Sequence, residues 1–226
     1  NREEIKMGIT AKGKKNAGLL TEGSIAKGIL SFAIPLFLGQ LLQQFYNVAD
    51  AWVVGNFADN DSFAAVSSAG SLTFLIIGFF NGIAIGGGVV ISKYFGARDE
   101  KSVEVAIHTN FLFGIIASVL STIVGIILIP VLLRLMQTPE NVLLLYLRVY
   151  FAGVSTIIMY NIGMSIMRAL GDSLHPLYYL FISSVINVVL DLLFVAVFHW
   201  GVGGAAAATI IAQGVSAVMC IYRMCK

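Results

Sequence analysis

Six long apolar stretches dominate the chain, and short segments rich in charged and polar residues separate them. A helix needs about 20 residues to cross a hydrocarbon layer of ~30 Å, and each stretch is long enough. Backbone groups cannot stay unpaired in lipid, and segments of this length favour helices over the ten-residue strands of a barrel. The pattern predicts an all-α, polytopic membrane protein, a six-transmembrane-helix bundle with helices at Ile29–Phe57, Phe63–Phe95, Val103–Leu133, Val142–Met167, Leu177–Phe198 and Gly204–Tyr222.

Composition supports this class. Of the 226 residues, 58% are apolar and only 12% are charged, whereas soluble domains are about half apolar and about a quarter charged. The expected surroundings are therefore membrane lipid. A formal net charge of +2 is too small to indicate a nucleic-acid partner.

Basic residues set the expected orientation. The pattern divides the chain into an N-terminal segment (1–28), the bundle (29–222) and a short end (223–226). With six crossings, 12 of the 14 Lys and Arg residues fall on the side that holds both termini. By the positive-inside rule, both termini are expected in the cytoplasm and the bundle in the plasma (inner) membrane. The chain begins without Met and stops just after an apolar helix, so we expect a piece of a longer protein.

Two aspartates lie inside apolar stretches. Asp50 and Asp191 each fall seven residues before the same expected face of the membrane, about 10 Å below it at 1.5 Å per residue. Thr209 of the last helix falls at a similar depth. Because the middle of each predicted helix lacks Lys and Arg, no salt bridge is available to either carboxylate. Ionisable groups at membrane depth are costly and mark ion or substrate paths.

Polar residues accompany both aspartates at helical spacing. On the first helix Gln40, Gln43, Gln44 and Asn47 form one stripe with Asp50, which must face a cavity or another helix. Such a stripe is either a functional surface or a seam of interhelical hydrogen bonds, each contributing about 0.6 kcal/mol. On the fifth helix Ser183 and Asn187 share the face of Asp191. Amide and carboxylate oxygens suit Na⁺ or H₃O⁺, and a desolvated carboxylate can instead hold a proton.

Other patterns bear on packing and on catalysis. Gly78, Gly82 and Gly86, followed by Gly87 and Gly88, are expected to allow close helix contact, and Pro35 predicts a kink in the first helix. The three histidines are scattered near helix ends, without the spacing of a catalytic or metal-binding set. The segment RALGD lacks the first glycine of the Gly-x-Gly-Asp motif of intramembrane aspartyl proteases. We therefore expect no enzyme.

Several segments together resemble a known family. Residues 25 to 226 are similar to the N-terminal half of multidrug and toxic compound extrusion (MATE) transporters, in IPLFLGQLLQQFYNVADAWVVG, YFGARDEKS, MRALGDS, INVVLDLLF and GVGGAAAATIIAQ. The resemblance implies one lobe of a twelve-helix protein, with a second six-helix bundle as its partner. It also implies efflux of small cationic or amphipathic organic compounds by antiport with Na⁺ or H⁺.

The resemblance also implies roles for particular residues. The cation or proton site, with Na⁺ as the metal it would take, corresponds to Asp50, Asn187, Asp191 and Thr209. The substrate cavity corresponds to Gln43, Tyr46 and Tyr146, together with Asn47 of the polar stripe.

Two alternatives stay open at this point. One is a flippase for lipid-linked precursors from the same superfamily, although such a protein is expected to carry a cationic cavity for pyrophosphate. The other is a membrane-embedded enzyme. The exported compound and the choice between Na⁺ and H⁺ are not determined by the sequence.

Overall fold

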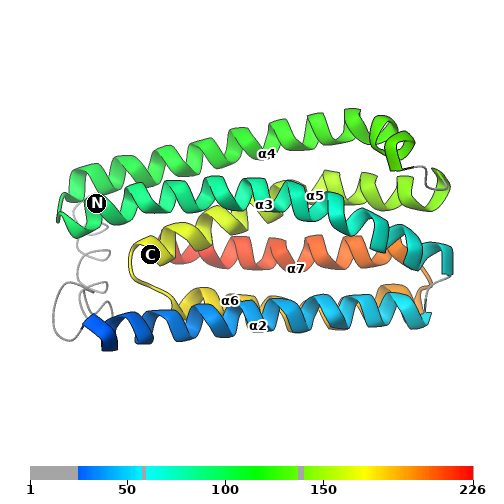
Figure 1. The fold of residues 1–226 in the computed structure, drawn as a ribbon, viewed down its shortest axis with the longest axis horizontal. Helices are drawn as coiled ribbons and strands as arrows, with labels where there is room; N and C mark the ends of the chain where they lie inside the picture. Colours follow the sequence, from blue (N-terminus) through cyan, green and yellow to red (C-terminus); the bar gives the residue numbers. More distant parts are fainter. Residues whose placement is uncertain (1–24, 58–59, 137–139, 226) are drawn as a thin grey trace.

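The computed structural model describes residues 25–57, 60–136 and 140–225, which are almost entirely helical (Figure 1). Its elements are α2 (Ile25–Phe57), α3 (Asn60–Gly96), α4 (Glu100–Met136), α5 (Glu140–Ala169), α6 (Leu174–Asp191), η1 (Leu192–Val197) and α7 (Gly201–Met224). The predicted all-α bundle is confirmed. The first helix begins at Ile25, within the expected N-terminal segment, and the rest of that segment lies outside the described residues.

The helices run along the long axis of the molecule, with α5 inside the bundle (Figure 1). Helix α5 packs against α3, α4 and α7, and α6 packs against both α2 and α7. The start of α2 and the end of α7 lie at the same end, together with the loop between α5 and α6 (Figure 1). We call this the Asp172 end, and we call the opposite end, which holds the connection from η1 to α7, the His199 end.

The outward surface is apolar over most of its length. Phe37, Leu112 and Val218 are each more than half exposed, as are many other large apolar side chains. Five helical segments have the length and hydropathy of membrane spans: 26–57, 100–131, 146–169, 174–197 and 201–224. Helix α3 covers the remaining predicted span. In water such a surface would be unfavourable, whereas in lipid it is the normal exterior of an integral membrane protein.

Close helix contacts on α3 involve two of the five glycines expected there. A methyl group at Gly78, Gly82 or Gly86 would meet nothing within 4 Å. At Gly87 it would overlap the Asn110 side chain, and at Gly88 it would overlap Ser165 Oγ. Ser165 also donates a hydrogen bond of 2.6 Å to the carbonyl oxygen of Ala84, which ties α5 to α3. The three spaced glycines have no close neighbour among the described residues, because periodicity alone does not say which side of a helix meets a neighbour.

Polar loop residues fix where α4 and α6 begin. Asp99 accepts hydrogen bonds from the backbone N–H and the hydroxyl of Ser102, which cap α4 and lower the pKa of the Asp99 carboxyl. Asp172 lies two residues before α6 begins and accepts a hydrogen bond from the backbone N–H of His175 in its first turn. The turn before it needs glycine, because Gly171 has φ of 85°. The GARDEKS and RALGDS segments are therefore helix connections at the Asp172 end.

The fifth predicted helix is not regular throughout. It is α-helical to Asp191 and continues as a π-helix over Leu192–Val197. Its wider turn closes through a hydrogen bond of 2.9 Å from the Phe198 N–H to the Leu193 carbonyl. π-helical turns are rare and frequently adjoin functional sites. Here the transition follows directly after the buried aspartate.

Candidate functional site

Asp50 and Asp191 come together in the structure. Asp191, at the end of α6, has no exposed surface, and Asp50 faces it from α2. The two carboxyl groups lie close enough to interact directly. Two ionised carboxylates repel each other and have no proton to donate. The pair can therefore hold one shared proton or flank one cation.

Asn187 and Thr209 complete the same cluster. Asn187 lies one turn before Asp191 and is 1% exposed, and its Nδ2 donates to Thr209 Oγ1 of α7 over 3.4 Å. The Tyr46 hydroxyl donates to the same oxygen, also over 3.4 Å. Tyr46 is one turn before Asp50 on α2. Three helices thus converge, and all four residues predicted for the cation or proton site are neighbours.

Several oxygens of this cluster have no hydrogen-bond partner. These are Asp50 Oδ1, Asn187 Oδ1 and both carboxylate oxygens of Asp191. Leaving buried polar atoms unpaired costs about 1–3 kcal/mol each. Na⁺ is a hard cation and prefers oxygen ligands, so carboxylate, amide and hydroxyl oxygens suit it. The residues present therefore fit a small cation or protons as the missing partner.

The two ends of the cluster differ in polarity. Toward the His199 end lies an apolar cluster from α2, η1 and α7, made of Val53, Val54, Val195, Val202 and Ala205. Val54 and Val195 in it have no exposed surface. Toward the Asp172 end, α6 and α7 continue with polar side chains. In this conformation the carboxylate pair is closed off on the His199 side.

Two tyrosines of α5 border the cluster. Tyr146 packs against the apolar cluster and lies close enough to Asp50 to interact electrostatically with it. Its ring stacks on that of Tyr150, with centroids 5.9 Å apart and planes 18° apart. The Tyr150 hydroxyl is buried without a partner. Tyr150 was missed in the sequence, although its position one turn from Tyr146 is a signal that could have found it.

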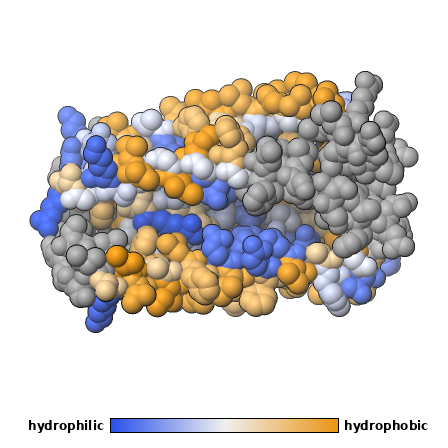
Figure 2. All heavy atoms as spheres, in the orientation of Figure 1, coloured by the Kyte–Doolittle hydropathy of each residue, from blue (hydrophilic) through white to orange (hydrophobic). Residues whose placement is uncertain are grey.

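The residues predicted for the substrate cavity divide between two environments. Tyr46 and Tyr146 adjoin the carboxylate pair, whereas Gln43 is half-buried and Asn47 is exposed. Asn47 Nδ2 donates to Gln44 Oε1 over 3.4 Å on the surface of α2. A hydrophilic patch lies in the middle of an otherwise largely apolar face (Figure 2). The stripe therefore runs from the buried cluster to the bundle surface.

A larger groove lies elsewhere, between α3 and α4. It has a volume of about 710 Å³ and is lined mainly by apolar side chains, together with Lys101, Ser102 and Asn110. None of the predicted site residues lines it. The candidate site is therefore the compact cluster around Asp50 and Asp191.

The fold and site define a multi-pass helical membrane protein with a buried acidic cluster. The family model described as MatE matches residues 35–193, which is more than half of the chain. The chain belongs to this family, the multidrug and toxic compound extrusion (MATE) proteins. The resemblance noted in the sequence is thereby confirmed.

Similar proteins agree with this assignment. The chain is 30% identical over 209 residues to the probable multidrug resistance protein YpnP of Bacillus subtilis, covering 91% of this chain and 47% of that protein. It is 33% identical over 195 residues to the probable multidrug resistance protein YoeA of the same organism, covering 83% and 42%. The chain thus spans about half the length of these relatives.

Solved structures show the same fold. An outward-facing multidrug resistance MATE family transporter of the MOP superfamily aligns with a TM-score of 0.86 at 31% identity, over 92% of this chain and 46% of that one. A MOP superfamily transporter from Pyrococcus furiosus, whose binding pocket is described as having reverse polarity, aligns with a TM-score of 0.85 at 31% identity, over the same shares.

Proposed function

We propose that this bundle is the ion-coupling half of a secondary active transporter that exports organic compounds in exchange for Na⁺ or H⁺. The observation that carries the proposal is the carboxylate pair of fully buried Asp191 and half-buried Asp50, whose oxygens Asp50 Oδ1, Asp191 Oδ1 and Asp191 Oδ2 are unpaired. Two carboxylates at membrane depth without a basic partner need a cation or protons to neutralise them. An ion held only in one conformation can drive exchange.

Coupling follows from where the two carboxylates lie. Asp50 belongs to α2, whereas Asp191, Asn187 and Thr209 belong to α6 and α7. A bound cation or proton attracts both carboxylates and holds α2 against α6. Its release leaves two negative charges that repel, so α2 is favoured in a different position. Pro35 lies within α2, which continues through it, and its missing backbone hydrogen bond makes that movement easier.

The polar surface of α2 indicates that this bundle has a protein partner. Gln40, Gln44 and Asn47 are exposed on this bundle, and amides facing lipid would be strongly unfavourable. We propose that this surface faces a water-filled cavity shared with a second six-helix bundle. The relatives named as multidrug resistance proteins are about twice as long. Their names support drugs as the exported class, and within it we propose small cationic or amphipathic organic compounds.

A lipid-linked precursor flippase is the second candidate. The structure with a reverse-polarity pocket has the same fold at similar identity, so fold alone does not decide the substrate. The chemistry here favours the first proposal, because the cluster offers carboxylate, amide and hydroxyl groups. A pyrophosphate group would meet two negative charges at this site.

The proposal is tested with the transporter that contains this bundle, reconstituted in liposomes. An inward Na⁺ gradient or an inward pH gradient is imposed, and efflux of a fluorescent organic cation is followed. One gradient is expected to accelerate efflux and the other not. An efflux rate that neither gradient changes contradicts ion coupling. Transport of a lipid-linked pyrophosphate instead supports the flippase.

Tyr46→Phe is expected to weaken coupling-ion binding about threefold. The substitution keeps the ring and removes only the hydrogen bond to Thr209, and such bonds contribute about 0.6 kcal/mol in membranes. Equilibrium ²²Na⁺ binding, or the pH dependence of efflux for protons, measures the change. Tyr178→Phe is the control, because Tyr178 is exposed on α6. Equal effects of the two substitutions contradict the role of the hydroxyl.

Both termini are proposed to lie in the cytoplasm, since basic residues gather on that side. The test replaces Cys220 and Cys225 by Ser and then introduces single cysteines at Asp99 and His199, which are exposed at opposite ends. An impermeant maleimide is expected to label position 199 in intact cells and position 99 only after permeabilisation. The reverse pattern contradicts this orientation.

A further inference from the structure

Polar side chains form a ladder between α6 and α7, which run antiparallel. Asn187 and Thr209 form one rung through their hydrogen bond. Further toward the Asp172 end, Ser216 Oγ donates to the Tyr179 carbonyl over 3.0 Å. At the end itself, an Arg223 guanidinium nitrogen lies 3.8 Å from Asp172 Oδ2. Residues earlier in the α6 region are thus paired with residues later in α7.

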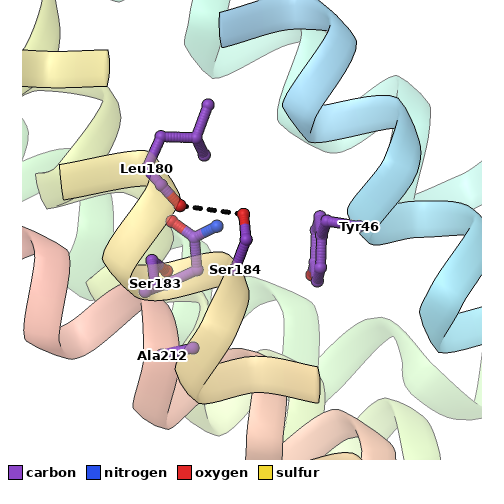
Figure 3. A pocket seen from close by; sticks show the side chains of 6 residues that line it. Tyr46, Leu180, Ser183, Ser184 and Ala212 are labelled. Atoms are coloured by element: carbon purple, nitrogen blue, oxygen red, sulfur yellow. Dashed lines mark hydrogen bonds between the residues drawn. The ribbon is translucent and has the colours of Figure 1, made fainter. Parts of the chain in front are cut away.

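This register places Gln213 of α7 level with Ser183 of α6, one turn from the Asn187–Thr209 rung. Both residues line a crevice together with Tyr46, Leu180, Ser184 and Ala212. Figure 3 shows Tyr46 of α2 on one side of this crevice, with Ser183 and Ser184 of α6 opposite. The crevice has about 170 Å³ of space, spread so narrowly that no water molecule fits in this conformation.

Gln213 is poorly explained as a packing residue. It is 8% exposed, and its Oε1 atom is buried without a hydrogen-bond partner. A seam that served only to join two helices would pair this oxygen, because an unpaired buried acceptor costs about 1–3 kcal/mol. Ser183 beside it is 3% exposed. An amide oxygen and a hydroxyl are ligands that suit a monovalent cation or hydronium.

We propose that Gln213, Ser183 and Tyr46 form a second station for the coupling ion, between the carboxylate pair and the Asp172 end. This inference rests on the proposed function and adds the route by which the ion arrives and leaves. The apolar cluster around Val54 and Val195 closes the other side of the pair. The route therefore follows the polar ladder.

Tyr46 controls entry to this station. Its hydroxyl bonds to Thr209, so the side chain spans from the carboxylate cluster to the crevice wall. Movement of α2 away from α6 breaks this bond and widens the crevice. The ion then exchanges one turn of helix at a time, with Asn187 Oδ1 and Gln213 Oε1 as successive oxygen ligands.

The test uses Gln213→Met in the transporter that contains this bundle, because Met has a similar length and lacks the amide. Two quantities are measured without organic substrate: equilibrium ²²Na⁺ binding, and ²²Na⁺/Na⁺ exchange across liposomes. For proton coupling, equilibrium proton uptake and the collapse of a pH gradient across liposomes take their place, also without organic substrate. Gln213→Met is expected to slow exchange at least tenfold while the affinity stays within twofold. Gln213→Asn, which keeps the amide, is expected to recover part of the rate.

Thr156→Val is the matched control. Thr156 Oγ1 donates to the Gly153 carbonyl of its own helix over 2.7 Å and lies 3.4 Å from the Ile210 carbonyl, so it lies between α5 and α7 and not between α6 and α7. Its substitution is expected to leave both quantities within twofold. Unchanged exchange in Gln213→Met overturns the station and leaves the proposed function intact. Exchange, affinity and thermal stability that fall together show a structural role, which also overturns it. Wild-type protein that binds neither ion overturns the proposed function and this inference together.

Discussion

Asp191→Asn and Asp50→Asn are each expected to reduce ion-driven efflux at least a hundredfold, with expression near that of the wild type. Asn is close to Asp in size, so the packing around α2 and α6 is preserved. It cannot ionise or take up a proton, and it lacks the charge that holds a cation. In the proposed mechanism the two carboxylates share one ion, so removing either carboxylate removes the coupling.

Efflux is measured in liposomes under imposed Na⁺ and pH gradients, and membrane expression is quantified in parallel. Asp99→Asn is the matched control, because Asp99 is exposed in the loop before α4 and Asn also caps helices. This variant is expected to transport like the wild type. If both buried variants transport normally across a titration of pH and Na⁺, the two aspartates have only a structural role.

Gly153→Leu is expected to cause a large loss of folded protein. Gly153 lies on α5, where a methyl group would already overlap the Ile210 side chain of α7. A leucine forces the two helices apart, and such overpacking costs about 1–3 kcal/mol or more. The Tm should fall by about 2–4 °C for each kcal/mol, by the scaling for domains of this size.

Gly82→Leu provides the comparison, because a methyl group at Gly82 meets nothing within 4 Å. The Tm of both variants is measured in detergent by thermal denaturation, and the folded fraction by size-exclusion chromatography. Gly82→Leu is expected to stay within one or two degrees of the wild type, an estimate that takes surface changes as about 0.5 kcal/mol. Equal losses in both variants contradict the packing described for α5 and α7.

The sequence by itself determined the class of protein and the elements of the fold. Membrane helices are long, apolar and internally hydrogen-bonded, so each one is recognisable without its neighbours. Asp50, Asn187, Asp191 and Thr209 were also identifiable in the sequence. Polar groups at membrane depth are costly, so they stand out against their apolar surroundings.

Only the tertiary structure decided which of these groups meet. Helical periodicity places residues on a face but does not choose the neighbour of that face. Of the five glycines expected at the α3 contacts, only Gly87 and Gly88 therefore make them, and the π-helical turn after Asp191 gave no periodic signal. Gln213 becomes a candidate ion ligand only because the packing of α6 against α7 places it level with Ser183. Such pairings depend on packing between residues far apart in sequence, which no local pattern encodes.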